Sequence, residues 1–253
     1  MTTNNLPMFY KEPVALNSKT HAELKLAKFK DYAFAAKTNS IQIVGVEFIE
    51  AAKEYPIVFV RLKNESFVPS TLIGLKEEQN LYLTKENTWD ARYIPAYVRR
   101  YPFIISEPLE NGEQVVFIDQ ESDRIQKKLG DALFNKDASE TEVLTSAKAF
   151  LMQHYAQSCF TDEFCQWLAK EDLFTDITAK FEIDRSGENF LFEHLFIINE
   201  VKLMQLPVEK VIELFSKGWL AWVYAHLISL TNLSQLIDRY SKLVPVKKVS
   251  AIV

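Results

Sequence analysis

The chain has 253 residues, of which 48% are hydrophobic and 25% charged, and its formal net charge is −5. This composition is typical of a folded globular protein, and it excludes a disordered chain, a collagen and a coiled coil. Acidic residues outnumber basic residues by 34 to 29, which argues against a dedicated nucleic-acid-binding protein, because phosphate affinity comes from a Lys and Arg surplus.

The beginning of the chain has no basic region followed by an apolar segment, so we expect no secretory signal there. The longest apolar stretch, 219–230, is shorter than the about 20 residues that a membrane span needs, and His226 interrupts it. The spacing of Cys159 and Cys165 fits neither a CxxC redox motif nor a zinc site. We therefore expect a cytoplasmic protein with two reduced cysteines and no membrane span.

The first half of the chain is rich in short runs of β-branched and aromatic residues separated by turn-forming residues. These runs predict mostly antiparallel strands at 41–48, 57–62, 72–75, 81–84 and 115–119. An alternative is a short helix near 46–54, which would place Phe48 and Ala52 on one face and would end before Pro56. Both interpretations remain open for that segment.

The second half begins with signals of helix formation. Ser139 stands three residues before Glu142, the spacing of a capping box, and an amphipathic pattern of apolar residues follows. Thr161 could cap a second helix that carries Phe164 and Leu168 on one face. We therefore predict two consecutive helices in this region.

A β-hairpin is predicted next. Apolar residues alternate with period two from 177 to 183, a turn follows at 184–189, and the chain returns through the apolar run 190–198.

Two helices complete the predicted elements. Pro207 opens the first at a favoured position and Gly218 closes it. Its apolar face contains Val208, Val211, Ile212 and Phe215. The last helix, from Trp219 to about Tyr240, is apolar nearly all round at its start and should be buried. Strands first and helices later, with one hairpin between them, predict an α+β fold.

The sequence contains no recognisable cofactor or metal motif. It has neither G-x-G-x-x-G nor G-x-x-x-x-G-K-[ST], the fingerprints of dinucleotide and P-loop sites. The four histidines, His21, His154, His194 and His226, are far apart and form no HxH, HxxxH or HExxH pattern. We expect no metal and no cofactor.

One segment concentrates groups suited to recognition. It contains Tyr93, Tyr97, Arg99, Arg100 and Tyr101. Arginine offers a planar fork for carboxylate or phosphate, and tyrosine adds amphipathic contact surface. The alternative is that both arginines pair with nearby acids while the tyrosines pack. In an extended segment the adjacent arginines would point to opposite faces, so at most one would face a ligand.

Glu47 and a polar seam are further candidates. Glu47 follows an apolar run and could act as a general base or orient a substrate amine; the alternative is an ion pair with an arginine. His226, Ser229 and Asn232 recur every three residues on the last predicted helix. A serine so placed is poorly oriented for nucleophilic catalysis, and no GxSxG motif exists, so structural hydrogen bonding is the favoured interpretation.

Several phrases together resemble the SapC-like family of bacterial proteins. They are EFIEAAKEYPIVFVRL (Glu47–Leu62), LIGLKEEQNLYL (Leu72–Leu83), YIPAYVRRYPFIIS (Tyr93–Ser106) and LFSKGWLAWVYAHLISLTNLSQL (Leu214–Leu236). His21 and the FAA run at Phe34–Ala36 occur in the same order. The resemblance extends over most of the chain. It implies one SapC-like domain over residues 1–253, with two lobes as an alternative, β-rich at about 1–125 and mainly helical at about 135–245.

The resemblance also implies a cellular context. The family takes its name from a surface-layer protein locus, and similar proteins are associated with TonB-dependent receptors, halogenase-like flavoproteins and cupin-like proteins in bacterial nutrient-uptake loci. No reaction or ligand is attached to the family. An unrelated peptide-transport permease shares the name, but it would need several membrane spans.

Two functions remain open on these grounds. The first is a non-enzymatic, cytoplasmic accessory or binding protein, with a protein or small molecule as its partner. The alternative is an enzyme or enzyme subunit that cooperates with a flavin-dependent halogenase-like or cupin-like oxygenase, using Glu47 and the region of Arg99 and Arg100 to hold a substrate. A purely structural assembly protein is a third hypothesis.

Overall fold

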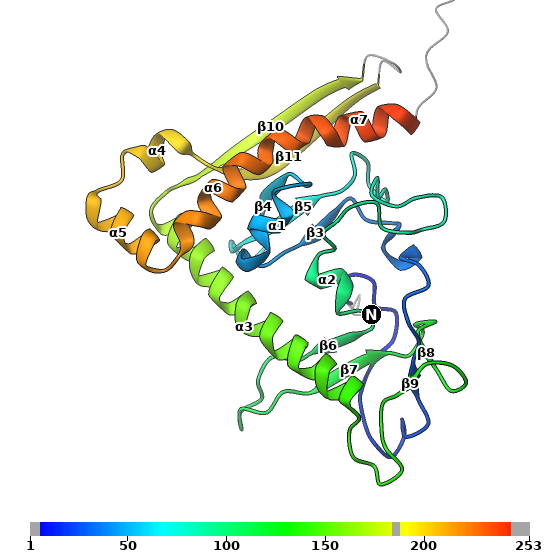
Figure 1. Cartoon of the computed structure of the whole chain (residues 1–253). Coiled ribbons are helices and arrows are strands. Elements are labelled where there is room, and N and C mark those ends of the chain that lie inside the picture. Colours follow the sequence, from blue (N-terminus) through cyan, green and yellow to red (C-terminus); the bar gives the residue numbers. More distant parts are fainter. Residues whose placement is uncertain (1–5, 184–187, 244–253) are drawn as a thin grey trace, which may run out of the picture. The chain divides into compact units, whose positions relative to one another are not determined.

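The computed structural model describes residues 6–183 and 188–243 (Figure 1). The described residues form two compact units, the first within Met1–Ala35 and Ala96–Ala156, the second within Ala36–Pro95 and Gln157–Val253. Each unit therefore combines two separate stretches of chain, which differs from the consecutive lobes considered in the sequence analysis. That the whole chain is one domain stays a prediction.

The first unit is built on two small antiparallel sheets. One has the strand order β1-β7-β6, with β1 at Pro13–Ala15, β7 at Val116–Asp119 and β6 at Phe103–Ile105. The other has the order β8-β2-β9, with β8 at Ile125–Gln126, β2 at Lys25–Leu26 and β9 at Asp131–Ala132. The unit also contains the 3₁₀ turn η1 (Ala33–Ala35), the short helix α2 (Ala96–Arg99) and the beginning of α3 (Glu142–Lys170). Its buried core includes Phe103, Ile118, Leu133, Leu144 and Leu151.

The second unit contains a five-stranded antiparallel sheet with the order β10-β11-β4-β5-β3. The strands are β3 (Ser40–Gln42), β4 (Ile57–Arg61), β5 (Phe67–Leu72), β10 (Phe174–Ile183) and β11 (Glu188–Ile198). The helical elements are η2 (Gly45–Glu47), α1 (Phe48–Ala51), α4 (Glu200–Met204), α5 (Val208–Ser216), α6 (Trp219–Ser229), η3 (Leu230–Asn232) and α7 (Leu233–Leu243). Figure 1 shows α7 beside the β10–β11 hairpin, where the Tyr240 ring meets the Phe190 ring edge to face at 4.9 Å.

Aromatic side chains form the core of the second unit. The ring of Phe164, on the part of α3 that belongs to this unit, lies 5.6 Å from the Trp219 ring and 5.3 Å from the Trp222 ring. Phe48 on α1 contacts Trp222 from another direction, at 6.1 Å between ring centroids. Large buried aromatic side chains contribute the most apolar area per residue, so this cluster is a main source of stability for the unit.

The fold is α+β, as predicted, but several local predictions need correction. The alternative of a helix near 46–54 is confirmed, because β3 ends at Gln42 and is followed by η2 and α1. Phe48 and Ala52 are both buried, as that helix required. The predicted strands at 72–75 and 81–84 are wrong: β5 ends at Leu72, and Leu83 makes only an isolated bridge.

The predicted hairpin is confirmed as β10 and β11, and its turn at 184–187 lies outside the described residues. Opposite Thr178, strand β11 has one extra residue, which creates a β-bulge, and His194 there has a φ of 59°. His194 is exposed.

The two helices predicted around Thr161 are one continuous helix, α3. The Thr161 hydroxyl does not cap a helix: it donates to the carbonyl of Gln157, one turn earlier, at 2.6 Å. At the beginning of α3, Thr141 rather than Ser139 accepts a hydrogen bond from a backbone N–H of the first turn, that of Leu144, at 3.4 Å.

The last helices are buried on one face rather than all round. On α6, Trp219, Val223 and His226 are fully buried, while Tyr224 and Ile228 are exposed. On α5 the apolar face predicted from periodicity is largely exposed, and Phe215 keeps 73% of its surface in contact with solvent. A period of 3.6 residues identifies a helix face but does not say what covers it.

Candidate ligand-binding site

The segment from Tyr93 to Tyr101 is not an extended strand. Helix α2 occupies Ala96–Arg99, so the argument that Arg99 and Arg100 point to opposite faces of a strand does not apply. The division between the two units also falls inside this segment, after Pro95. Tyr93 therefore belongs to the second unit, and the other candidate residues of the segment belong to the first.

In the second unit, Tyr93 and Glu47 are direct partners. The Tyr93 hydroxyl donates to Glu47 Oε1 at 2.6 Å, and the backbone N–H of Val44 donates to Glu47 Oε2 at 2.8 Å. Glu47 is only 4% exposed. Each carboxylate oxygen thus accepts a hydrogen bond, as burial of a carboxylate requires.

In the first unit, Arg99 and Arg100 lie against aromatic rings. The exposed Arg99 guanidinium is 5.2 Å from the Phe150 ring centroid, and the Arg100 guanidinium is 3.8 Å from the Tyr97 ring centroid. Burial, together with the charges of Arg100 and Arg99, lowers the pKa of His154 to about 4. These groups form a cationic and aromatic cluster that packs against α3.

Tyr101 is buried and has two well-defined contacts. Its hydroxyl donates to Asp119 Oδ2 at 3.0 Å, and its ring stacks on that of Phe34 with centroids 4.3 Å apart. Burial raises the pKa of Tyr101 to about 12, so its hydroxyl remains protonated at neutral pH. Of the five residues that the sequence analysis singled out in this segment, Tyr101 is the one that lines a cavity of the first unit.

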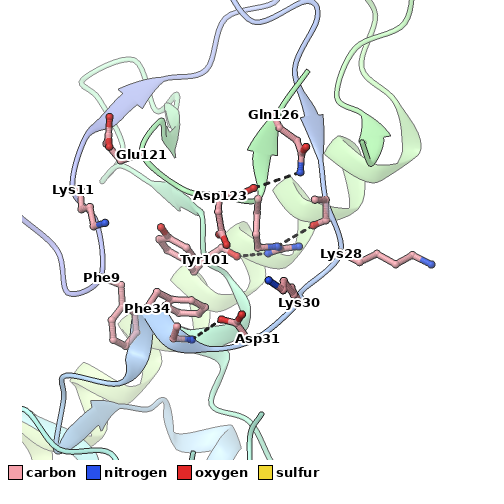
Figure 2. A pocket seen from close by; sticks show the side chains of 13 residues that line it. Phe9, Lys11, Lys28, Lys30, Asp31, Phe34, Tyr101, Glu121, Asp123 and Gln126 are labelled. Carbon is pink, nitrogen blue, oxygen red and sulfur yellow. Dashed lines mark hydrogen bonds between the residues drawn. The ribbon is translucent and has the colours of Figure 1, made fainter. Parts of the chain in front are cut away.

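That cavity has a volume of about 480 Å³ (Figure 2). Phe9, Phe34 and Tyr101 provide aromatic surface, and the charged lining residues are Lys11, Lys28, Lys30, Asp31, Glu121, Asp123 and Arg124. In Figure 2 the side chain of Lys28 points away from the cavity. The cavity is lined by four chain segments that are far apart in sequence, so no single sequence motif predicts it.

Arg124 lines the cavity and was not a candidate in the sequence analysis. Its Nε donates to the carbonyl of Ala27 at 3.0 Å, and its Nη1 donates to the carbonyl of Tyr101 at 2.5 Å. The guanidinium lies 3.5 Å from the centroid of the Phe29 ring. Burial lowers the pKa of Arg124 to about 10, so it is still a cation at neutral pH. Within the described residues, no carboxylate lies within 4.0 Å of this guanidinium.

A second cavity, of about 700 Å³, lies in the second unit and is lined in part by Tyr93. Several of its charged groups already have partners. Arg239 forms a 2.7 Å ion pair with Asp90, and the Glu54 carboxylate accepts both of its 2.9 Å contacts from the backbone N–H of Arg92. The cavity of the first unit is therefore the better candidate, because its half-buried Arg124 forms no ion pair within the described part of the chain, whereas the half-buried Arg239 of the second cavity does.

The polar seam on α6 and η3 makes structural contacts. His226 Nε2 accepts from the backbone N–H of Ile198 at 3.1 Å, and burial lowers the pKa of His226 to about 3. Ser229 Oγ accepts from Ile57 N–H at 2.9 Å and donates to the carbonyl of His226 at 2.6 Å. Asn232 Nδ2 donates to the carbonyl of Ala52 at 2.6 Å. The serine hydroxyl proton is thus engaged with its own helix rather than with the imidazole.

Residues 6–183 and 188–243 contain no group of three or more His, Cys, Asp or Glu side chains placed to hold a metal ion. Nor does any helix in those ranges combine the length and the apolar character needed to cross a membrane.

Comparisons with known proteins agree with the resemblance noted in the sequence. No curated protein and no solved structure matches the chain. The SapC family model matches residues 16–236, which is most of its length. The chain therefore belongs to the SapC family.

Proposed function

We propose that this protein is a non-catalytic accessory protein that binds a small organic ligand in the cavity of its first unit. The observation that carries the proposal is the convergence of the Phe9, Phe34 and Tyr101 rings with the Arg124 guanidinium around about 480 Å³ of space. Ligand sites in proteins are typically concave and between about 300 and 1,000 Å³, and the volume of this cavity lies in that range.

Backbone geometry supports this assignment. Phe9 has a φ of 79°, in the left-handed region that bulky side chains rarely adopt, and its ring meets the Phe34 ring edge to face at 5.3 Å. Strained backbone persists where the surrounding structure holds it, and such residues concentrate at binding and catalytic sites. The strain at Phe9 is consistent with a ring held in place at the cavity wall.

The cellular setting of the proposal comes from family membership. We place the protein in the cytoplasm, in a surface-layer or TonB-dependent nutrient-uptake context, with a halogenase-like flavoprotein or a cupin-like protein as a candidate partner. The alternative is an enzyme subunit that uses Glu47 to hold a substrate. Because both Glu47 oxygens accept hydrogen bonds from Tyr93 and Val44, the geometry favours a binding role over one in which that carboxylate takes a proton.

The proposal is tested by ligand capture. The purified protein is incubated with a protein-free small-molecule extract of its native cells, repurified and weighed intact by native mass spectrometry. We expect a bound species that is lost in Phe34→Ala and retained in Phe215→Ala, which alters an exposed ring of the second unit. Retention of the same species by Phe34→Ala, or no bound species in the parent protein, would contradict the proposal.

A further inference from the structure

We infer that Arg124 is the anion-binding group of this cavity and that the ligand is a small planar organic anion, a carboxylate carried on an aromatic or conjugated ring. This inference rests on the proposed function and adds the chemical class of the ligand. It depends on three features of the cavity: a half-buried cation without an acidic partner, free N–H donors on that cation, and aromatic walls.

The first feature is the unpaired charge of Arg124. A charge that is partly removed from water is normally balanced by an opposite charge, because its loss of hydration is costly. Arg124 is half-buried, and its protein partners are two backbone carbonyls and the face of Phe29. These contacts offset part of the lost hydration, but none of them is an ion pair with a carboxylate. A ligand carboxylate would supply the missing negative charge.

The second feature is the geometry of the guanidinium. Arginine has five N–H donors, and the two hydrogen bonds of Arg124 use Nε and one N–H of Nη1. Within the described residues, Nη2 has no hydrogen-bonded acceptor, so three N–H donors remain, one on Nη1 and two on Nη2. Arginine holds a carboxylate through two parallel hydrogen bonds, and donors on neighbouring guanidinium nitrogens match the spacing of its two oxygens.

The third feature is the shape of the walls. Phe34 is half-buried and stacks on Tyr101, and the half-buried Phe9 stands edge-on to Phe34. Rings held in this way present flat apolar surface with little conformational freedom left to lose on binding. They therefore favour a flat ligand over a flexible aliphatic one.

The acidic residues of the lining do not prevent the cavity from binding an anion. Glu121 and Asp123 are exposed, so solvent and salt screen their charges, and in Figure 2 the Glu121 carboxylate points away from the aromatic rings. Asp31 Oδ1 already accepts a hydrogen bond from the backbone N–H of Ala33 at 3.0 Å. The exposed lining residues Lys11 and Lys30 offset part of this negative charge.

Three probes separate charge from shape in a calorimetric titration: 2-naphthoate, its uncharged analogue 2-naphthamide, and cyclohexanecarboxylate, which lacks the flat ring. We expect 2-naphthoate to bind at least about tenfold more tightly than either of the others, since the amide lacks the charged oxygens that strengthen a hydrogen bond and the cyclohexane ring cannot lie flat against Phe34. Arg124→Gln should weaken 2-naphthoate about 10- to 100-fold and leave 2-naphthamide within about twofold.

Arg124→Gln also removes hydrogen bonds to two backbone segments, which lowers stability. Variants at exposed lysines therefore test the effect of charge without this loss. Lys30→Gln, at the rim, should weaken 2-naphthoate by a few fold and reduce the salt dependence of binding, whereas Lys136→Gln, an exposed lysine outside the cavity lining, should change neither. Thermal melting of each variant shows which of them are folded.

The outcomes distinguish this inference from the proposed function. If the protein retains a ligand from cell extract that depends on Phe34 but is uncharged, or if folded Arg124→Gln binds 2-naphthoate as the parent does, the inference is wrong and the proposed function stands. Tighter binding of 2-naphthamide, or of a cation competing for Asp31 and Asp123, would also overturn it. If neither the probes nor any extract component binds the cavity, the proposed function itself is wrong.

Discussion

The hydroxyl of Tyr93 donates a 2.6 Å hydrogen bond to the carboxylate of Glu47, which lies 46 residues earlier in the chain. This contact joins the loop before α2 to the last residue of η2, within the second unit. Both residues were candidates from the sequence, one as a recognition group and one as a base or ion-pair partner. Their contact satisfies a buried carboxylate with a neutral donor.

Tyr93→Phe should lower the free energy of unfolding by about 1.5–3 kcal/mol, because a hydrogen bond to a buried, charged acceptor is lost. Urea denaturation measures the change. Tyr224→Phe is the matched control, because Tyr224 is 46% exposed and should change stability by less than about 0.5 kcal/mol. Equal effects in the two variants would show that the Tyr93–Glu47 contact adds nothing specific to stability.

Adjacent residues on α5 provide a second test. Leu214 is fully buried, whereas Phe215 is 73% exposed. Leu214→Ala should therefore cost about 2–5 kcal/mol, and Phe215→Ala less than about 0.5 kcal/mol, in the same denaturant titration. A large loss of stability in Phe215→Ala would mean that this ring is covered in the folded protein in solution.

These two positions illustrate what the sequence could predict. The amphipathic period identified α5, and the strong β-branched run identified β4, because local pattern decides whether a segment forms a helix or a strand. The same period placed Phe215 on the apolar face of that helix, and the residue is exposed. Burial depends on which elements pack together, and that information is not local.

The candidate site likewise depends on contacts that local sequence patterns do not predict. Tyr101 was singled out because it lies in a run of arginines and tyrosines, and it does line the cavity. Arg124 had no comparable signal, because its partners Ala27 and Tyr101 are 97 and 23 residues away in sequence. Only the tertiary fold brings these groups together, so a lone arginine in a turn could not be recognised from its neighbours.

Gly45 makes a close packing contact that can be tested by substitution. A Cβ at this position would overlap the ring of Trp222, and the backbone N–H of Gly45 donates to Thr161 Oγ1 at 2.8 Å. Gly45→Ala should therefore cost about 1–3 kcal/mol through overpacking. Trp222→Leu removes the ring that the new Cβ would overlap. In a double-mutant cycle, the double variant should therefore lose about 1 kcal/mol less free energy of unfolding than the two single variants lose in sum. Simple additivity would contradict the predicted overlap.

Two histidines make stability depend on pH. Burial lowers the pKa of His226 to about 3, and burial with Arg100 and Arg99 lowers that of His154 to about 4, from an ordinary value of 6.5. Between pH 6.5 and about 4 the unfolded chain therefore binds more protons than the folded chain, so stability falls as the pH is lowered. At pH 5 each histidine should account for a loss of about 2 kcal/mol relative to pH 7.5.

Urea titrations at pH 7.5 and pH 5 measure this loss. The free energy of unfolding should differ between pH 7.5 and pH 5 by about 2 kcal/mol less in His154→Gln than in the parent protein. The exposed His194→Gln is the control for replacing a histidine. If His154→Gln leaves the pH dependence as large as in the parent protein, His154 is not held neutral in the folded state.

The most direct test of the binding role is a high-resolution crystal structure of the protein purified from its native cells without extensive dialysis. The account predicts electron density for a flat molecule against Phe34, with an acidic group within hydrogen-bond distance of the Nη1 and Nη2 edge of Arg124. A cavity filled only by water, with a small molecule bound elsewhere in the protein, would contradict it.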